Sequence, residues 1–104
     1  MIVKRTKSRE LALTVEEGCV EVVERHYGKY LDKATYGITL RGNVVELWRE
    51  EGGRRQVVVR GTLTGSEAEW VREAMMNIKR FIQFGTLFFY LRDRLSSAYA
   101  GSRL

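Results

Sequence analysis

Cys19 and His26 are the residues whose types could form a nucleophile and its general base. They are the single cysteine and the single histidine of the chain, so neither an intrachain disulfide nor a site with two histidines can form. On a helix, their spacing puts both side chains on one face but ~10 Å apart along the axis. Proton transfer needs a separation of about 3 Å. We therefore expect Cys19 to be a core residue and His26 to lie on an amphipathic face.

Acidic and glycine-rich segments predict no reaction either. Neighbouring carboxylates of the kind used in acid–base catalysis occur at Glu16-Glu17, Glu50-Glu51 and Glu67/Glu69, where capping or solvated positions account for them. Segments 52–55 and 61–65 contain glycines but lack the spacing of a phosphate-binding loop. We expect a protein that is not an enzyme and that uses no metal ion, no cofactor and no small-molecule substrate.

Aromatic and basic residues alternate in a way that is typical of single-stranded nucleic-acid binding. Such proteins need ring faces on which bases stack and cations that contact phosphates. The sequence predicts that Trp48, Tyr27 and Tyr30 stack bases. The predicted phosphate contacts are Arg41, Arg60, Lys29 and Lys33, together with Lys4, Arg5 and Lys7 of a basic N-terminal arm. A purely structural interpretation also stays open, in which a helix covers Trp48, the tyrosines are core residues and the arm is only solvated.

Length and composition limit the class of protein. The chain has 104 residues, which is one domain, and its 44 % apolar and 30 % charged residues are typical of a folded protein. The net charge of +5 favours an anionic partner. No segment approaches the ~20 apolar residues that span a bilayer, and the N-terminus does not resemble a signal peptide. We expect a cytoplasmic protein without membrane contact, and the scarcity of Asn and Gln favours a thermophilic source.

The segment that follows the basic arm (1–9) has two interpretations. Thr14 and Glu17 have the spacing of a capping box, and the apolar residues behind them fall on one helical face, which predicts a helix over 15–31. Leu11, Leu13 and Val15 also alternate as a strand does, with Glu17-Gly18 as a hairpin turn. We adopt the helix as the first element of a region (10–65) that contains a helix and an antiparallel sheet.

A three-stranded antiparallel meander is predicted over residues 36–63. Gly42-Asn43 provides a tight turn between the first two strands. This turn places Leu40 opposite Val45, Ile38 opposite Leu47, and Gly37 opposite Trp48, with the indole on the polar face. A three-residue turn with a glycine bulge at Gly52-Gly53 then places Arg60 opposite Glu46 and Val58 beside Trp48, because the alternative register would bury Arg60 without a partner.

The C-terminal region (66–98) is predicted to be a long apolar helix. Ser66 and Glu69 form a second capping box, and the helical pattern continues to about residue 97. Such a helix would be roughly 46 Å long, whereas a domain of this size is about 33 Å across. It therefore projects beyond the domain or breaks near Gly85-Thr86. A second copy of the chain would cover its apolar sides, or a break would fold its end back on the sheet. We adopt a homodimer with an interface of Ile78, Phe81, Phe84, Phe88, Leu91 and Leu95.

This layout resembles two families. Tyr27-Gly-Lys-Tyr30, the hairpin over 36–48 and the apolar helix after Trp70 are similar in arrangement to the archaeal ThermoDBP single-stranded-DNA-binding proteins. That resemblance implies a small basic domain with an aromatic and basic cleft and a helical dimerisation element. The combination of a short sheet with apolar helices also resembles the small dimerising subunits of the KEOPS tRNA-modification assembly, which implies a surface for protein partners.

The sequence therefore predicts an α+β fold: a basic arm, a helix, a three-stranded antiparallel β-meander, and a long C-terminal helix that mediates dimerisation. The expected function is non-catalytic binding of single-stranded DNA or RNA with little sequence preference. The alternative is a dimerising subunit that binds protein partners.

Overall fold

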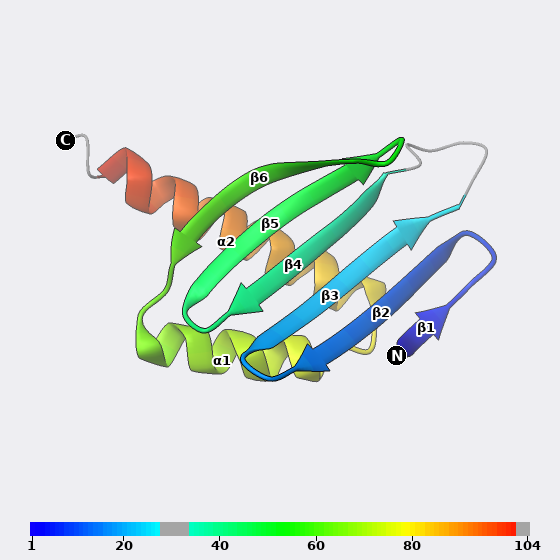
Figure 1. The fold of residues 1–104 in the computed structure, drawn as a ribbon, viewed down its shortest axis with the longest axis horizontal. Coiled ribbons are helices and arrows are strands. Elements are labelled where there is room, and N and C mark those ends of the chain that lie inside the picture. Colours follow the sequence, from blue (N-terminus) through cyan, green and yellow to red (C-terminus); the bar gives the residue numbers. More distant parts are fainter. Residues whose placement is uncertain (28–33, 102–104) are drawn as a thin grey trace.

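A single antiparallel sheet of six strands forms most of the protein. The computed structural model describes residues 1–27 and 34–101, and side chains up to residue 96. The strands are β1 (Ile2–Arg5), β2 (Arg9–Glu16), β3 (Cys19–His26), β4 (Thr35–Arg41), β5 (Val44–Glu51) and β6 (Arg54–Thr62), and the helices are α1 (Gly65–Met76) and α2 (Phe81–Gly101). Each strand pairs with the next along the chain, and both helices lie on the same face of the sheet (Figure 1).

The predicted three-stranded meander is wrong, because the N-terminal part of the chain adds three more strands. The helix expected over 15–31 is wrong where the structure describes it: residues 15–26 belong to the β2–β3 hairpin, with Gly18 at a positive φ in the turn, and 28–31 lie outside the described residues. Val15, Cys19 and Val22 have helical spacing, but the segment forms strands. Strand alternation pairs Leu13 with Val22 on the face of the sheet that the helices cover, where both are buried. The basic arm is also structured in part, since β1 pairs with β2.

The β4–β5 hairpin is as predicted. Gly42 adopts a positive φ of 60°, and all three expected cross-strand pairs are present. Alternation places Ile38 and Leu47 against the helices, whereas Trp48 lies on the opposite, open face of the sheet.

The β5–β6 register is partly as predicted. Arg60 lies opposite Glu46 as expected, but the turn has two residues, with Gly52 and Gly53 both at positive φ. The extra residue lies instead in a β-bulge where the register shifts between Leu47 and Trp48, so that Val57, not Val58, lies opposite the indole. The bulge lets the tight glycine turn coexist with the Arg60–Glu46 pair.

The predicted single C-terminal helix is two helices, and the break precedes Gly85. α1 begins after Thr64, whose hydroxyl accepts from the Glu67 N–H in a capping box, so the cap lies two residues before the predicted Ser66. α1 ends at Met76, and the side-chain oxygen of Gln83 accepts from the backbone N–H groups of Lys79 and Arg80. This side-chain cap satisfies donors that a helix start leaves unpaired.

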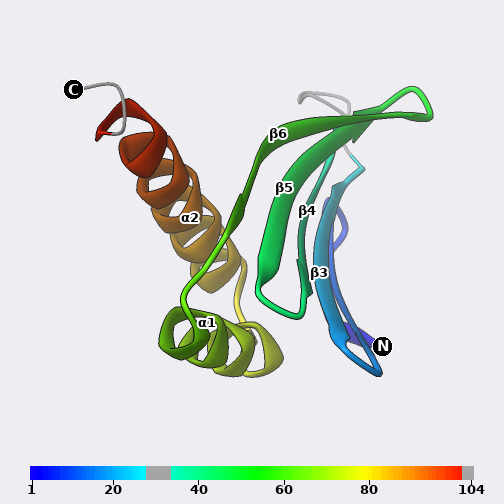
Figure 2. The ribbon, with the colours of Figure 1, turned by 60° about the vertical axis from the view of Figure 1, so that its left-hand side comes forward.

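One face of α2 packs against the sheet, and this packing accounts for most of the predicted dimer interface. Ile78 and the α2 residues Phe84, Phe88, Leu91 and Leu95 are buried in the core of the single chain, and Phe81 is partly buried against it. The chain therefore covers these apolar residues with its own sheet. This agrees with the alternative prediction, in which a break folds the end of the helix back on the sheet. Away from its start, α2 leans away from the sheet (Figure 2).

The open face has a small apolar centre of its own. Trp48 is 1 % exposed and lies flat over Gly37, where an added Cβ would come 2.1 Å from the indole ring. Glycine at position 37 is therefore required by the ring, and the ring closes the surface over the β4–β5 pair.

We expect Gly37→Ala to destabilise the protein by about 1–3 kcal/mol, because the new methyl group overlaps the indole of Trp48. Gly85→Ala is the matched control: its Cβ would meet open space within α2, and it should stabilise the protein by about 0.5–1 kcal/mol. Urea denaturation followed by circular dichroism measures both. Equal effects of the two substitutions would contradict the stacking of Trp48 on Gly37.

Candidate functional site

A cleft of about 430 Å³ lies between α2 and the face of the sheet that the helices cover. Its walls are the ends of β3 and β4 nearest their connection, one residue of β6, and the first half of α2. The lining residues are Glu24, His26, Tyr36, Val58, Phe84, Gly85, Phe88, Phe89 and Arg92.

Aromatic rings line the cleft in a continuous series. His26 and Tyr36 meet edge to face with their centroids 6.1 Å apart, and Tyr36 meets Phe88 in the same way at 5.9 Å. Phe88 contacts Phe89 at 6.1 Å, and Phe89 is 54 % exposed. Edge-to-face packing holds each ring at an angle to its neighbour, so the cleft offers a planar group both ring edges and the exposed ring of Phe89.

Positive charge accompanies these rings. The guanidinium of Arg92 lies 4.8 Å from the centre of the Phe89 ring, and Arg49 donates from Nε to the Tyr36 hydroxyl at 3.3 Å. At the start of α2, Lys4 and Arg9 lie 5.7 Å and 5.4 Å from the centre of Phe81. Rings combined with cations suit a ligand that has both planar groups and negative charges.

The cleft also contains a carboxylate–imidazole pair. Glu24 on β3 is 7 % exposed, and its Oε1 atom lies 2.8 Å from Nε2 of His26. The two residues share the covered face because their spacing on a strand places their side chains on the same side. Among the described residues that line the cleft, Glu24 is the acidic one and Arg92 is the basic one.

The predicted stacking residue Trp48 lies on the other side of the sheet. It is not under a helix, but it is sealed: the Arg55 guanidinium lies 3.7 Å from its ring centre, and Gly37 lies directly against the ring. Its Nε1–H donates to Thr39 at 2.9 Å, and the Thr39 hydroxyl donates to Glu21 at 2.8 Å. An indole that is 1 % exposed offers no surface to a base, so the prediction that it faces solvent is wrong.

Arg41 and Arg60 lie together near Trp48 but share their surroundings with acids. With Arg55 and Glu46 they line a depression of about 260 Å³ on the open face. Glu46 lies opposite Arg60 in the register, and Glu50 lies opposite Arg55. The arginines of this surface therefore have glutamates as cross-strand neighbours, although the depression itself is lined by three arginines and one glutamate.

A third predicted group surrounds Glu10 on the open face. Arg5 donates to Glu10 Oε1 at 2.6 Å, Arg25 donates to Oε2 at 3.0 Å, and the Tyr27 hydroxyl donates to the same oxygen at 3.2 Å. Arg5 and Tyr27 are thus committed to a buried carboxylate. The other predicted contacts Lys29, Tyr30 and Lys33 lie outside the described residues, while Lys4 lies over the ring of Phe81 and Lys7 is exposed.

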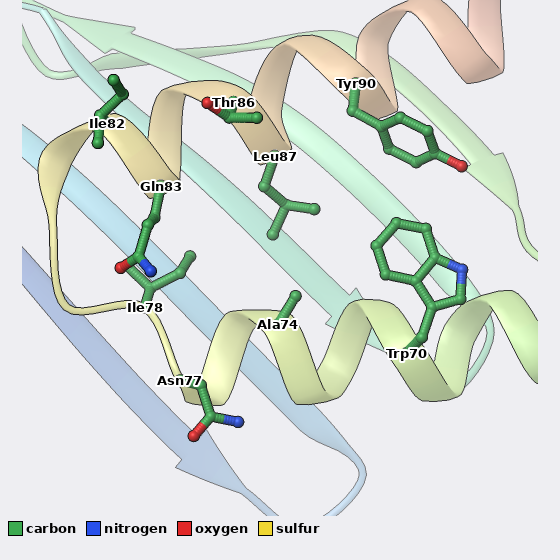
Figure 3. A pocket seen from close by; sticks show the side chains of 9 residues that line it. All are labelled: Trp70, Ala74, Asn77, Ile78, Ile82, Gln83, Thr86, Leu87 and Tyr90. Carbon is green, nitrogen blue, oxygen red and sulfur yellow. The ribbon is translucent and has the colours of Figure 1, made fainter.

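A second hollow, of about 640 Å³, separates α1 from α2 on the outer surface (Figure 3). It is mainly apolar: Trp70 and Tyr90 close one end with their rings 5.2 Å apart, and Ile82 projects at the other end with 72 % of its surface exposed. This α1–α2 groove and the cleft lie on opposite sides of α2, because Ile82 and Tyr90 line only the groove and Phe89 and Arg92 line only the cleft.

Sequence reasoning missed the cleft because it treated the aromatic residues of 81–90 as packing residues. Phe84 and Phe88 do pack, but Phe89 remains exposed beside Arg92. The signal was the alternation of Glu24 and His26, which places two polar residues on the covered side of a strand. The helix prediction for 15–31 concealed that pattern.

Comparison with models of protein families, with curated proteins and with solved structures finds no match to this chain. Within residues 1–27 and 34–101, no cluster of His, Cys, Asp and Glu side chains is suited to hold a metal ion. Neither described helix has the length and apolar character needed to cross a bilayer. The geometry of the cleft is therefore the basis for a functional proposal.

The hydrogen bonds from Arg5 hold the pKa of Glu10 below its ordinary value, with further contributions from Tyr27 and Arg25. A carboxyl group with a lowered folded-state pKa stabilises the fold above its unfolded-state pKa, and this stabilisation is lost as the pH falls through the folded-state value. We expect Glu10→Gln to lower the free energy of unfolding at neutral pH. The free energy of unfolding of this variant should also fall less steeply than that of the wild type as the pH is lowered. Urea midpoints measured between neutral and acidic pH test this.

The control is Glu16→Gln, which removes an exposed carboxylate on the same strand. A profile for Glu10→Gln that matches both wild type and this control would show that the Glu10 cluster does not contribute to acid stability.

Proposed function

We propose that this protein binds single-stranded nucleic acid, DNA or RNA, in the cleft between α2 and the sheet, and that it performs no chemistry on the strand. The observation that supports this most is the exposed ring of Phe89, with the guanidinium of Arg92 4.8 Å from its centre. Bases stack on aromatic faces in a largely sequence-tolerant way, since every base has a π-face. We therefore expect the affinity to depend little on the sequence of the strand.

The charges near the cleft favour a polyanion. Arg92 lines the cleft, Arg49 contacts Tyr36 while it also pairs with Glu51, and Lys4 and Arg9 add positive charge over Phe81 at the start of α2. Glu24, the acidic side chain among the described lining residues, is paired with His26. The preference for unpaired strands follows from the rings, because a duplex keeps its base faces stacked inside.

The open face supports binding less well. Its arginines lie together, but Trp48 is sealed and offers no ring face on which a base could stack. We therefore place the stacking role on Phe89, His26 and Tyr36, and not on Trp48.

We expect Phe89→Ala to weaken binding of single-stranded oligonucleotides by about 1–3 kcal/mol, the usual contribution of one stacked base. Ile82→Ala is the matched control, because it removes another exposed apolar side chain of α2 on the side away from the cleft. Fluorescence anisotropy measures the affinity of both variants over a salt series. The logarithm of the binding constant should fall with the logarithm of the salt concentration, with a slope of about −0.7 per phosphate contacted.

Equal affinities for wild type and both variants would exclude the cleft as the binding site. A wild-type affinity that does not change with salt would exclude phosphate contacts and with them the proposed function.

A second candidate function is that of a self-associating subunit, and the α1–α2 groove favours it. The groove offers both a projecting side chain, Ile82, and a hollow beside Trp70 and Tyr90, as a two-fold contact between identical surfaces requires. Glu69 and Glu73 are exposed on α1, whereas Lys79 and Arg80 are exposed before α2, so an antiparallel second copy would bring opposite charges together.

We expect Ile82→Glu to shift the protein from dimer to monomer, because it places a charge in the apolar contact. Phe89→Glu adds the same charge on the other side of α2 and should leave the dimer intact. Sedimentation equilibrium distinguishes these outcomes, and a wild-type protein that is monomeric at high concentration would refute this second function.

A further inference from the structure

The depression on the open face has an excess of positive charge. Three neighbouring strands contribute its lining: Thr39 and Arg41 from β4, Val44 and Glu46 from β5, and Arg55 and Arg60 from β6. Three guanidinium groups therefore surround one carboxylate. All three arginines are exposed, whereas Glu46 is half-buried. Such a lining favours an anionic ligand.

A β-bulge brings two of these arginines together. Arg55 and Arg60 are five residues apart, and this odd spacing on a regular strand would place their side chains on opposite faces of the sheet. The register shift opposite Leu47 and Trp48 inserts one extra residue, Val58, between them, so both arginines line the depression. Bulges are over-represented at sheet edges and beside functional sites, where they re-aim side chains.

Arg55 is held in position before any ligand binds. Its guanidinium lies 3.7 Å from the ring centre of Trp48, and Trp48 is itself fixed by a hydrogen bond to Thr39. A guanidinium over an aromatic ring presents its N–H donors at its edge. The ion pair of Arg55 with Glu50 uses Nε at 3.7 Å, which leaves the terminal nitrogens for a ligand. Less side-chain freedom is therefore lost on binding.

The size and donors of the depression suit a compact oxyanion. Its volume of about 260 Å³ is below the ~300–1,000 Å³ of sites for drug-sized ligands, so it suits a single small group. The Thr39 hydroxyl donates its proton to Glu21, so the guanidinium groups are the donors toward a ligand. Guanidinium forks match the geometry of phosphate oxygens. A phosphoryl group with close to two negative charges balances three arginines and one glutamate.

We infer that this depression is an anion site that binds a dianionic phosphoryl group through Arg41, Arg55 and Arg60. The group is either free phosphate or the phosphate of a monoester. A phosphodiester carries one negative charge, leaves part of the positive charge uncompensated and binds less well. The inference goes beyond the proposed function, because the depression lies on the open face, away from the cleft, and needs no strand.

The test titrates isotope-labelled protein with inorganic phosphate at a mildly alkaline pH, where phosphate is dianionic, and sodium chloride keeps the ionic strength constant. Nuclear magnetic resonance at millimolar phosphate should show saturable shifts of Arg41, Arg55 and Arg60. Arg60→Gln should weaken the binding about tenfold, as the loss of a charge-assisted hydrogen bond implies. Glu46→Gln should strengthen it about threefold, because it removes the negative charge of the lining.

Arg54→Gln is the matched control. It removes an exposed arginine of the same strand that is not among the described residues lining the depression, and it should leave the phosphate affinity unchanged. Circular dichroism establishes that the variants fold. If Arg60→Gln does not fold, Arg41→Gln and the opposite effect of Glu46→Gln test the same claim.

A second comparison distinguishes the sources of the phosphoryl group. One short single strand is prepared with a 5′-phosphate and with a 5′-hydroxyl end. Shifts on the open face with the phosphorylated strand alone would assign the site to strand ends. Shifts with inorganic phosphate but with neither strand would assign it to free phosphate or a small phosphate ester. Equal shifts with both strands would contradict the preference for a dianion.

Two results would refute the anion site. The first is the absence of any saturable shift of the three arginines at millimolar phosphate. The second is an equal loss of affinity in Arg54→Gln and Arg60→Gln, because the binding then reflects net charge alone. Neither result bears on the cleft, since the phosphate titration contains no strand.

Discussion

The packing of one face of α2 against the sheet determines the rest of this structure. Phe84, Phe88 and Leu91 point into the core, so the two neighbouring faces of the helix are turned in opposite directions. One presents Phe89 and Arg92 to the cleft, and the other presents Ile82 and Tyr90 to the α1–α2 groove. The turn between the helices makes this possible, since a continuous helix from residue 65 could not lie along the sheet in the same way.

Because side chains alternate between the two faces of the sheet, its buried and paired glutamates fall on different faces with different partners. Glu10 and Glu46 on the open face lie among arginines and stabilise the sheet surface, whereas Glu24 points toward the helices and has a histidine as its partner. Trp48 also lies on the open face and stabilises the sheet surface. Its ring is held by contacts with Gly37 and Arg55, so it is a structural residue.

The sequence predicted the fold correctly where a local pattern of residues was compatible with one structure only. Gly42-Asn43 between alternating segments defined the β4–β5 hairpin, and the unfavourable burial of Arg60 defined its pairing with Glu46. The β2–β3 hairpin could not be separated from a helix, because its apolar spacing suits both. The bulge in β6, the helix break before Phe81 and the cleft depend on packing between distant segments, which local patterns do not encode. The sealing of Trp48 depends on Arg55 for the same reason.

The most direct test of the central claim is to map the binding surface by nuclear magnetic resonance. In a titration of labelled protein with a single-stranded oligonucleotide, we expect shifts at the end of β3, the start of β4 and residues 84–92 of α2. Shifts concentrated on the open face around Arg41, Arg55 and Arg60, with the cleft unchanged, would contradict the account.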